Sequence, residues 1–219
     1  MGWAWWWKRR PVRTIAFLGN YLPRKCGIAT FTSDLLGAAA ARHPQSCCFA
    51  VPVNDIDGRY RYPDAVRFEI EEQEVDSYRR AACLLNSSNV DVVSVQHEFG
   101  IFGGPAGSHL LTLLRELRAP VVTTLHTVLL KPNADQHRVM QELIARSTRL
   151  VVMTERGRTT LSEAYQAPLS KIDLIPHGIP NVPFVAPNYY KNQFGVHGCH
   201  SPTRGRESFA ARGLSHAAA

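Results

Sequence analysis

The chain has 219 residues, 45% of them hydrophobic and 20% charged, which is the composition of an ordinary soluble globular protein long enough to bury a core. All but one unit of the net charge of +7 comes from the two ends, because residues 14–198 carry 18 basic and 17 acidic side chains. A nearly neutral body argues against a nucleic-acid partner, whose phosphates would require a basic surface.

Apolar runs alternate along the chain with stretches of helical periodicity. In chain order the pattern predicts 14–18 (strand), 28–39 (helix, capped by Thr30 or Thr32), 47–53 (strand), 68–70 (strand), 76–86 (helix), 90–96 (strand), 106–117 (helix), 120–125 (strand), 134–146 (helix), 149–153 (strand), 157–165 (helix) and 171–175 (strand). Continuous Val/Ile/Leu runs between amphipathic helices are typical of a parallel sheet covered on both faces. We therefore predict a doubly wound, mostly parallel α/β domain.

The N-terminal segment and the cysteines indicate the cellular compartment of the protein. Residues 1–13 hold four tryptophans and a basic cluster, and we expect a flexible leader there, with weak peripheral contact to a membrane as the alternative. The five cysteines form no CxxC pair, and the sequence shows no secretory signal. These features predict reduced thiols and a cytoplasmic protein.

Histidines stand at the ends of three predicted strands. His97, followed by Glu98, ends the first of these strands, and His126 and His177 end the other two. The carboxyl ends of parallel strands form the ligand-binding edge of such a sheet, so we expect these side chains along one rim. Imidazole can donate to or accept from a sugar or phosphate oxygen, and a carboxylate can accept from vicinal hydroxyls.

The first loop adds an anion site and leaves other chemistries open. Gly27 precedes a predicted helix N-terminus, where free N–H groups favour a diphosphate. Cys26 in the same loop leaves a Cys/His hydrolase open, and His97, Glu98 and His126 leave a metal site open, although their spacing is not a recognised ligand pattern. The turn GNYLPRKCG lacks GxGxxG, which argues against a dinucleotide oxidoreductase.

Five segments carry a resemblance to a known family. The chain resembles the N-terminal half of bacterial group 1 (family 4) glycosyltransferases of GT-B architecture in YLPRKCGIATFTSDL (21–35), QHEFGIFGG (96–104), VVTTLHTVL (121–129), RLVVMTERG (149–157) and KIDLIPHGIPNVPF (171–184). The resemblance implies two facing Rossmann-like domains. The first holds a saccharide or lipid-linked acceptor, and the second holds a nucleotide-sugar donor. It also implies hexosyl transfer with retention of configuration, with the donor as substrate, no cofactor and no required metal.

The resemblance also implies roles for single residues. Gly27 matches the glycine that approaches the donor diphosphate, and His126 matches the histidine that contacts the transferred sugar near its anomeric centre. His97 and Glu98 fall on the acceptor side of the cleft. On this basis His126 is the expected catalytic residue.

The resemblance implies a domain organisation as well. It predicts a Rossmann-like domain over residues 14–185 and the start of an interdomain segment over 186–198, with His177 and Gly178 as hinge and cleft wall. Residues 199–219 depart from the family pattern, and their composition predicts a disordered tail. Without a donor-binding domain the chain is expected to transfer sugar poorly or not at all. A non-catalytic carbohydrate-binding or regulatory module is the alternative.

Overall fold

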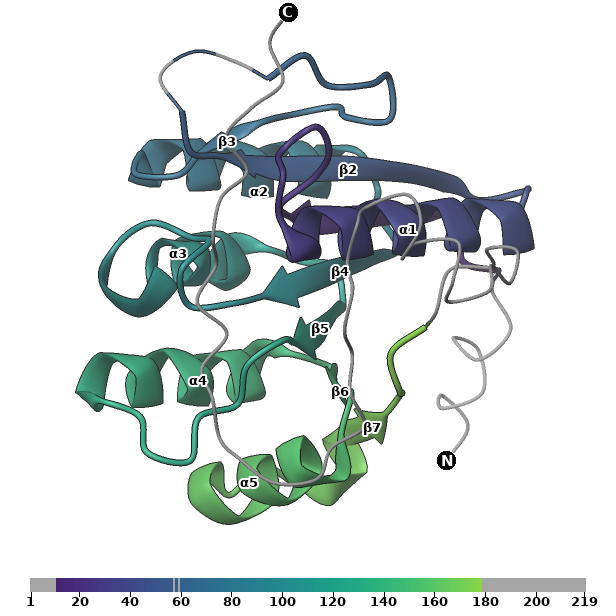
Figure 1. Cartoon of the computed structure of the whole chain (residues 1–219). Helices are drawn as coiled ribbons and strands as arrows, with labels where there is room; N and C mark the ends of the chain where they lie inside the picture. Colours follow the sequence, from purple (N-terminus) through teal and green to yellow (C-terminus); the bar gives the residue numbers. More distant parts are fainter. Residues whose placement is uncertain (1–10, 57, 59, 179–219) are drawn as a thin grey trace, which may run out of the picture. The chain divides into compact units, whose positions relative to one another are not determined.

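The computed structural model describes residues 11–56, 58 and 60–178, and a seven-stranded sheet runs through them. The strands lie in the order β3-β2-β1-β4-β5-β6-β7 (Figure 1), and every neighbouring pair is parallel. Their bounds are β1 (Thr14–Gly19), β2 (Cys47–Asn54), β3 (Ile70–Glu71), β4 (Val92–His97), β5 (Val121–Leu125), β6 (Arg149–Val152) and β7 (Ile172–Leu174). The prediction of a doubly wound, mostly parallel α/β fold is confirmed.

Helices connect the strands and cover the sheet. They are α1 (Gly27–Arg42), α2 (Val75–Ser87), α3 (His109–Glu116), α4 (Ala134–Arg146) and α5 (Glu155–Tyr165), with short 3-10 turns η2 (Pro105–Gly107) and η3 (Leu169–Lys171). The bounds of α4 agree with the sequence pattern because Asn133 and Gln136 form a reciprocal capping box at its start.

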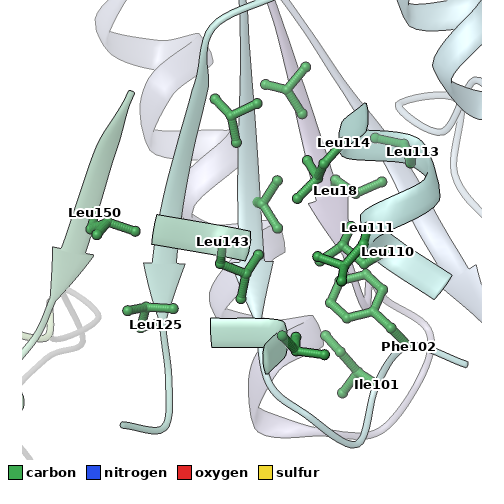
Figure 2. Close-up of a cluster of buried hydrophobic side chains, with 14 of the residues drawn as sticks. Leu18, Ile101, Phe102, Leu110, Leu111, Leu113, Leu114, Leu125, Leu143 and Leu150 are labelled. Carbon is green, nitrogen blue, oxygen red and sulfur yellow. The ribbon is translucent and has the colours of Figure 1, made fainter. Parts of the chain in front are cut away.

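Side-chain alternation along the strands divides the core into two layers. Ala16 and Leu18 of β1 join the larger cluster with α2, α3 and α4, some of whose leucines are drawn in Figure 2. Phe17, between them, joins a smaller cluster with Leu36 of α1. Because successive strand residues point to opposite faces, α1 covers one face of the sheet and α2–α4 cover the other.

Two local predictions were wrong. The helix expected from residue 106 begins at His109, because Ala106 and Gly107 take positive φ angles of 52° and 78° that interrupt a right-handed helix. The first helix is capped neither by Thr30 nor by Thr32. The Cys26 sulfur caps it by accepting a hydrogen bond from the Ala29 amide at 3.3 Å.

The chain divides into a compact unit, Met1–His177, and a second unit that begins at Gly178. The predictions of a flexible leader within 1–13, of an interdomain segment at 186–198 and of a disordered tail at 199–219 concern residues that lie wholly or mostly outside the described part. Among the described helices, none is long and apolar enough to cross a bilayer.

Candidate functional site

The strand order places a ligand-binding crevice next to β1. The chain proceeds outward from β1 through β2 to β3, and then returns to the other side of β1 with β4. In open parallel sheets such a reversal leaves a crevice beyond the carboxyl ends of the two strands. The loop after β1 leads into α1, and the loop after β4 carries the QHEFGIFGG segment, so both predicted site segments border this crevice.

The loop after β1 fixes the start of α1. The Cys26 sulfur accepts hydrogen bonds from the Ala29 amide and, at 3.4 Å, from the Asn20 side-chain nitrogen. Asn20 is itself buried, and its side-chain oxygen accepts a hydrogen bond from Arg24 at 3.0 Å. Arg24 also forms a salt bridge with Asp55 at 3.1 Å. This network holds a guanidinium close to an exposed helix N-terminus.

A cavity of about 400 Å³ opens at this end of the sheet. It is lined by Asn20, Arg24, Cys26, Gly27, Ile28, Phe31, Ile101, His126 and His177. The structure therefore brings Gly27, His126 and His177 together, from three segments far apart in the sequence, as the strand-end pattern predicted. Gly27 has no heavy atom within 4 Å of the position that a Cβ would occupy, so the backbone there is open to a ligand.

Phe31 of α1 organises the two histidines. Its ring meets the His126 imidazole edge to face at a centroid distance of 4.9 Å, and the His177 imidazole at 5.2 Å. Both imidazoles also border a second cavity of about 410 Å³, whose other lining residues are Leu125, Val128, Leu129, Leu130, Val152, Met153, Thr154, Arg156, Gly157 and Thr160. His126 and His177 therefore form the wall between the cavity beside α1 and the cavity beside α5.

The hydrogen-bond partners of His126 come from β4. Its Nε2 lies 3.1 Å from the side-chain oxygen of Gln96, and its backbone amide donates to the carbonyl of His97 at 3.0 Å. The ring is half-buried, and this burial lowers the pKa of His126, with the nearby Glu98 carboxylate opposing the shift. At neutral pH the imidazole is therefore mainly uncharged.

Glu98 ties the ends of two strands together. One carboxylate oxygen accepts the Phe99 amide at 3.0 Å, and the other accepts the Thr127 hydroxyl. Glu98 thus fixes the residue next to His126. Its side chain is half-buried, and each oxygen keeps a lone pair for a further donor.

His97 does not lie on the rim. Its side chain is fully buried, stacked on Phe102 at 6.1 Å and edge to face with Phe99 at 5.0 Å. Neither ring nitrogen has a hydrogen-bond partner within the described residues, and burial lowers the pKa of His97 to about 3. The expected acceptor contact of His97 does not fit this position, because the imidazole points into the core that α2 and α3 cover. Gly178, the other expected hinge residue, is exposed.

Two residues of the site were not among the sequence candidates. Arg24 supplies the cation of the first cavity, and Gln96 contacts His126. Arg24 lies in the PRKC turn, where nothing in the sequence distinguishes it from a solvated surface charge. Alternation along β4 could have identified Gln96. Val93, Val95 and His97 occupy one face of the strand, so the polar residues Ser94 and Gln96 share the other face.

The geometry gives little support to the two alternative chemistries, a Cys/His hydrolase and a metal site. The Cys26 sulfur is used as a helix cap, and no histidine is among its hydrogen-bond partners in the part that the structure describes. No group of three or more His, Cys, Asp or Glu side chains in residues 11–56, 58 and 60–178 is arranged to hold a metal ion.

Comparison with known proteins agrees with this fold and segment order. The solved structure of a glycosyltransferase from Rickettsia africae ESF-5 superposes with a TM-score of 0.51 at 14% identity, over 87% of this chain and 51% of that one. The chain thus spans about half the length of that protein. No curated protein matches the sequence. The family model Glycosyltransferase Family 4 matches residues 26–181, which is more than half of the chain, and the chain accordingly belongs to this family.

Proposed function

We propose that the described domain supplies the first half of the active site of a retaining, nucleotide-sugar-dependent hexosyltransferase. The observation that carries the proposal is the cavity beside α1, because it joins a helix N-terminus, a guanidinium and two imidazoles at the carboxyl end of a parallel sheet. Family membership supports the reaction class, and this cavity supports the assignment of residues to it.

The two ends of the cavity suit different parts of a nucleotide sugar. At Gly27 the free N–H groups of α1 and the positive end of its dipole favour an anion, and the Arg24 guanidinium, held in its salt bridge with Asp55, adds N–H donors. These groups suit the diphosphate, whose charge grows as the glycosidic bond breaks. Preorganised donors of this kind stabilise the departing diphosphate without a strong base.

His126 is the group that we propose next to the transferred sugar. It lies between the two cavities, and its largely uncharged ring can exchange hydrogen bonds with sugar hydroxyls. The acceptor then enters from the second cavity, whose aliphatic side chains suit an apolar sugar face or a lipid-linked acceptor and whose Thr154 and Arg156 suit sugar hydroxyls. Glu98, with spare lone pairs beside Thr127, remains a candidate acceptor contact, and His177 closes the wall between the two cavities.

Transfer itself is expected to need a donor-binding domain. Residues 1–219 span about half of the compared glycosyltransferase, so this chain incubated with a panel of nucleotide sugars, such as UDP-glucose and GDP-mannose, should give no turnover above background if the donor contacts come from a second domain that also excludes water. Fusion of the chain to the donor-binding domain of an active family member should produce transfer. Robust turnover by the chain alone would refute the requirement for a second domain.

Within such a fusion, His126→Ala should lower kcat/KM by about 100-fold, because a positioned group at the reacting sugar is lost. His137→Ala is the matched control, since His137 is exposed on α4, stacks on Tyr165 and lines neither cavity. Equal activity of the two variants would show that His126 has no role in the reaction. Saccharide binding without any nucleotide-sugar binding would instead favour the non-catalytic carbohydrate-binding module.

A further inference from the structure

The Gln96 side chain is the most constrained contact of His126. It is fully buried, its oxygen lies 3.1 Å from His126 Nε2, and its nitrogen donates to the Ser94 hydroxyl at 3.1 Å. Gly19 of β1 packs against it, because a Cβ at position 19 would come within 2.9 Å of the Gln96 Cβ. The amide is therefore held between β1 and β5, with its oxygen directed at the imidazole.

An amide oxygen can only accept a hydrogen bond, so the ring nitrogen that meets it must carry the proton. We propose that Gln96 is a positioning residue that holds His126 as the Nε2–H tautomer and leaves Nδ1 unprotonated as the hydrogen-bond acceptor for a sugar hydroxyl. Only the identity of that ligand rests on the proposed function. Within the described residues Nδ1 has no hydrogen-bond partner, and the ring borders both cavities.

The reversed orientation of the Gln96 amide would produce the other tautomer of His126. If the amide were reversed, its NH₂ group would donate to Nε2, Ser94 would donate to the amide oxygen, and the His126 proton would lie on Nδ1. A sugar hydroxyl would then have to accept from His126 and could not donate to it. The tautomer of one imidazole therefore distinguishes the two arrangements, in the absence of any ligand.

A neutral amide also suits this position better than a carboxylate. A carboxylate facing Nε2 would stabilise an imidazolium, which would leave both ring nitrogens as donors. The uncharged amide keeps the acceptor at Nδ1 and agrees with the burial that already favours the neutral ring. Gln96→Glu is therefore expected to raise the pKa of His126 by at least about one unit, equal to about a tenfold shift in its protonation equilibrium.

The test is a long-range ¹H–¹⁵N spectrum of the histidine rings of ligand-free chain 1–219 at mildly alkaline pH. In the unaltered chain His126 should show the pattern of a protonated Nε2 and a bare Nδ1. In Gln96→Met, which retains the side-chain length, the populations should shift toward those of the exposed His43. Gln141→Met is the matched control and should leave the His126 signals unchanged, because Gln141 bonds the Tyr165 carbonyl away from the site.

A protonated Nδ1 in the unaltered chain would overturn the proposal, as would an unchanged tautomer in folded Gln96→Met. If Gln96→Met fails to fold, the spectrum of the unaltered chain and the His126 pKa in Gln96→Glu still decide, and an unraised pKa in folded Gln96→Glu would count against the proposal. Because no sugar is present, these results are independent of the transfer assay. A correct tautomer together with inactive fusions would reject the proposed function and leave the role of Gln96 intact.

Discussion

Gly103→Ala is expected to lower the free energy of unfolding by about 3 kcal/mol, because the added methyl group has no space. A Cβ at position 103 would lie 1.9 Å from the carbonyl oxygen of Glu72 and 2.6 Å from Nδ1 of His109. The first of these is backbone and cannot move aside as a side chain would. Urea unfolding should show a lower midpoint with an unchanged slope.

The same substitution at Gly100 is the control. Gly100 lies in the same loop and has nothing within 4 Å of its Cβ position, so Gly100→Ala should change the unfolding free energy by less than about 0.5 kcal/mol. The buried Tyr78 hydroxyl explains the difference, since it accepts the Gly103 amide at 3.0 Å and donates to the Glu72 carbonyl at 2.9 Å. Similar midpoints for the two variants would show that the loop is not packed as described.

The loop that contains Gly103 also borders the candidate site. Ile101 lines the cavity beside α1, while Phe102 lies close to Leu110 and Leu111 of α3 in the core cluster (Figure 2). Displacement of the loop would therefore alter the cavity and the core together.

The second large effect is a loss of stability in acid that comes from His97. Burial places the pKa of this histidine at about 3 in the folded chain, well below its value in the unfolded chain. The unfolded state therefore binds the proton first, so the stabilising contribution is complete above about pH 6.5 and is lost as the pH falls toward 3. Between about pH 7 and pH 5 the unfolding free energy should fall by about 2 kcal/mol through this group alone.

His97→Met isolates this contribution. Methionine suits the apolar position, and both buried ring nitrogens lack partners in the described part, so the variant should be no less stable than the unaltered chain at neutral pH. Its unfolding free energy should change by about 2 kcal/mol less than that of the unaltered chain over the same pH range. His43→Met, which removes an exposed histidine at the end of α1, should keep the full dependence. Parallel pH profiles for His97→Met and the unaltered chain would contradict the burial of His97.

Element order was predictable because periodicity, loops and caps agree along most of the chain. The helix over residues 134–146 shows this most clearly, since an Asn cap and a regular apolar stripe define the same bounds. The failures have local causes. Sequence patterns do not show that Ala106 takes a positive φ, nor that a cysteine rather than a threonine caps α1.

On β4 the residue predicted for the site was wrong by one position, His97 instead of Gln96. A strand-end histidine was expected at the rim, but Val93, Val95 and His97 share the face that α2 and α3 cover, whereas Ser94 and Gln96 share the face of α1. His126 belongs to the α1 face and meets Gln96 there. Strict alternation along the strand would have given this answer, because a shift of one residue exchanges the two faces. The Arg24 contacts depend on how a loop folds, and no periodicity describes them.

The central claim is that a nucleotide sugar binds where Gly27, His126 and His177 meet. The most direct test is a titration of chain 1–219 with UDP-glucose and with GDP-mannose, followed by the histidine ring signals. The signals of His126 and His177 should shift together with the amides at the start of α1, while those of buried His97 and exposed His43 stay unchanged. Unshifted His126 and His177 signals at millimolar ligand, or shifts confined to His43, would contradict the account.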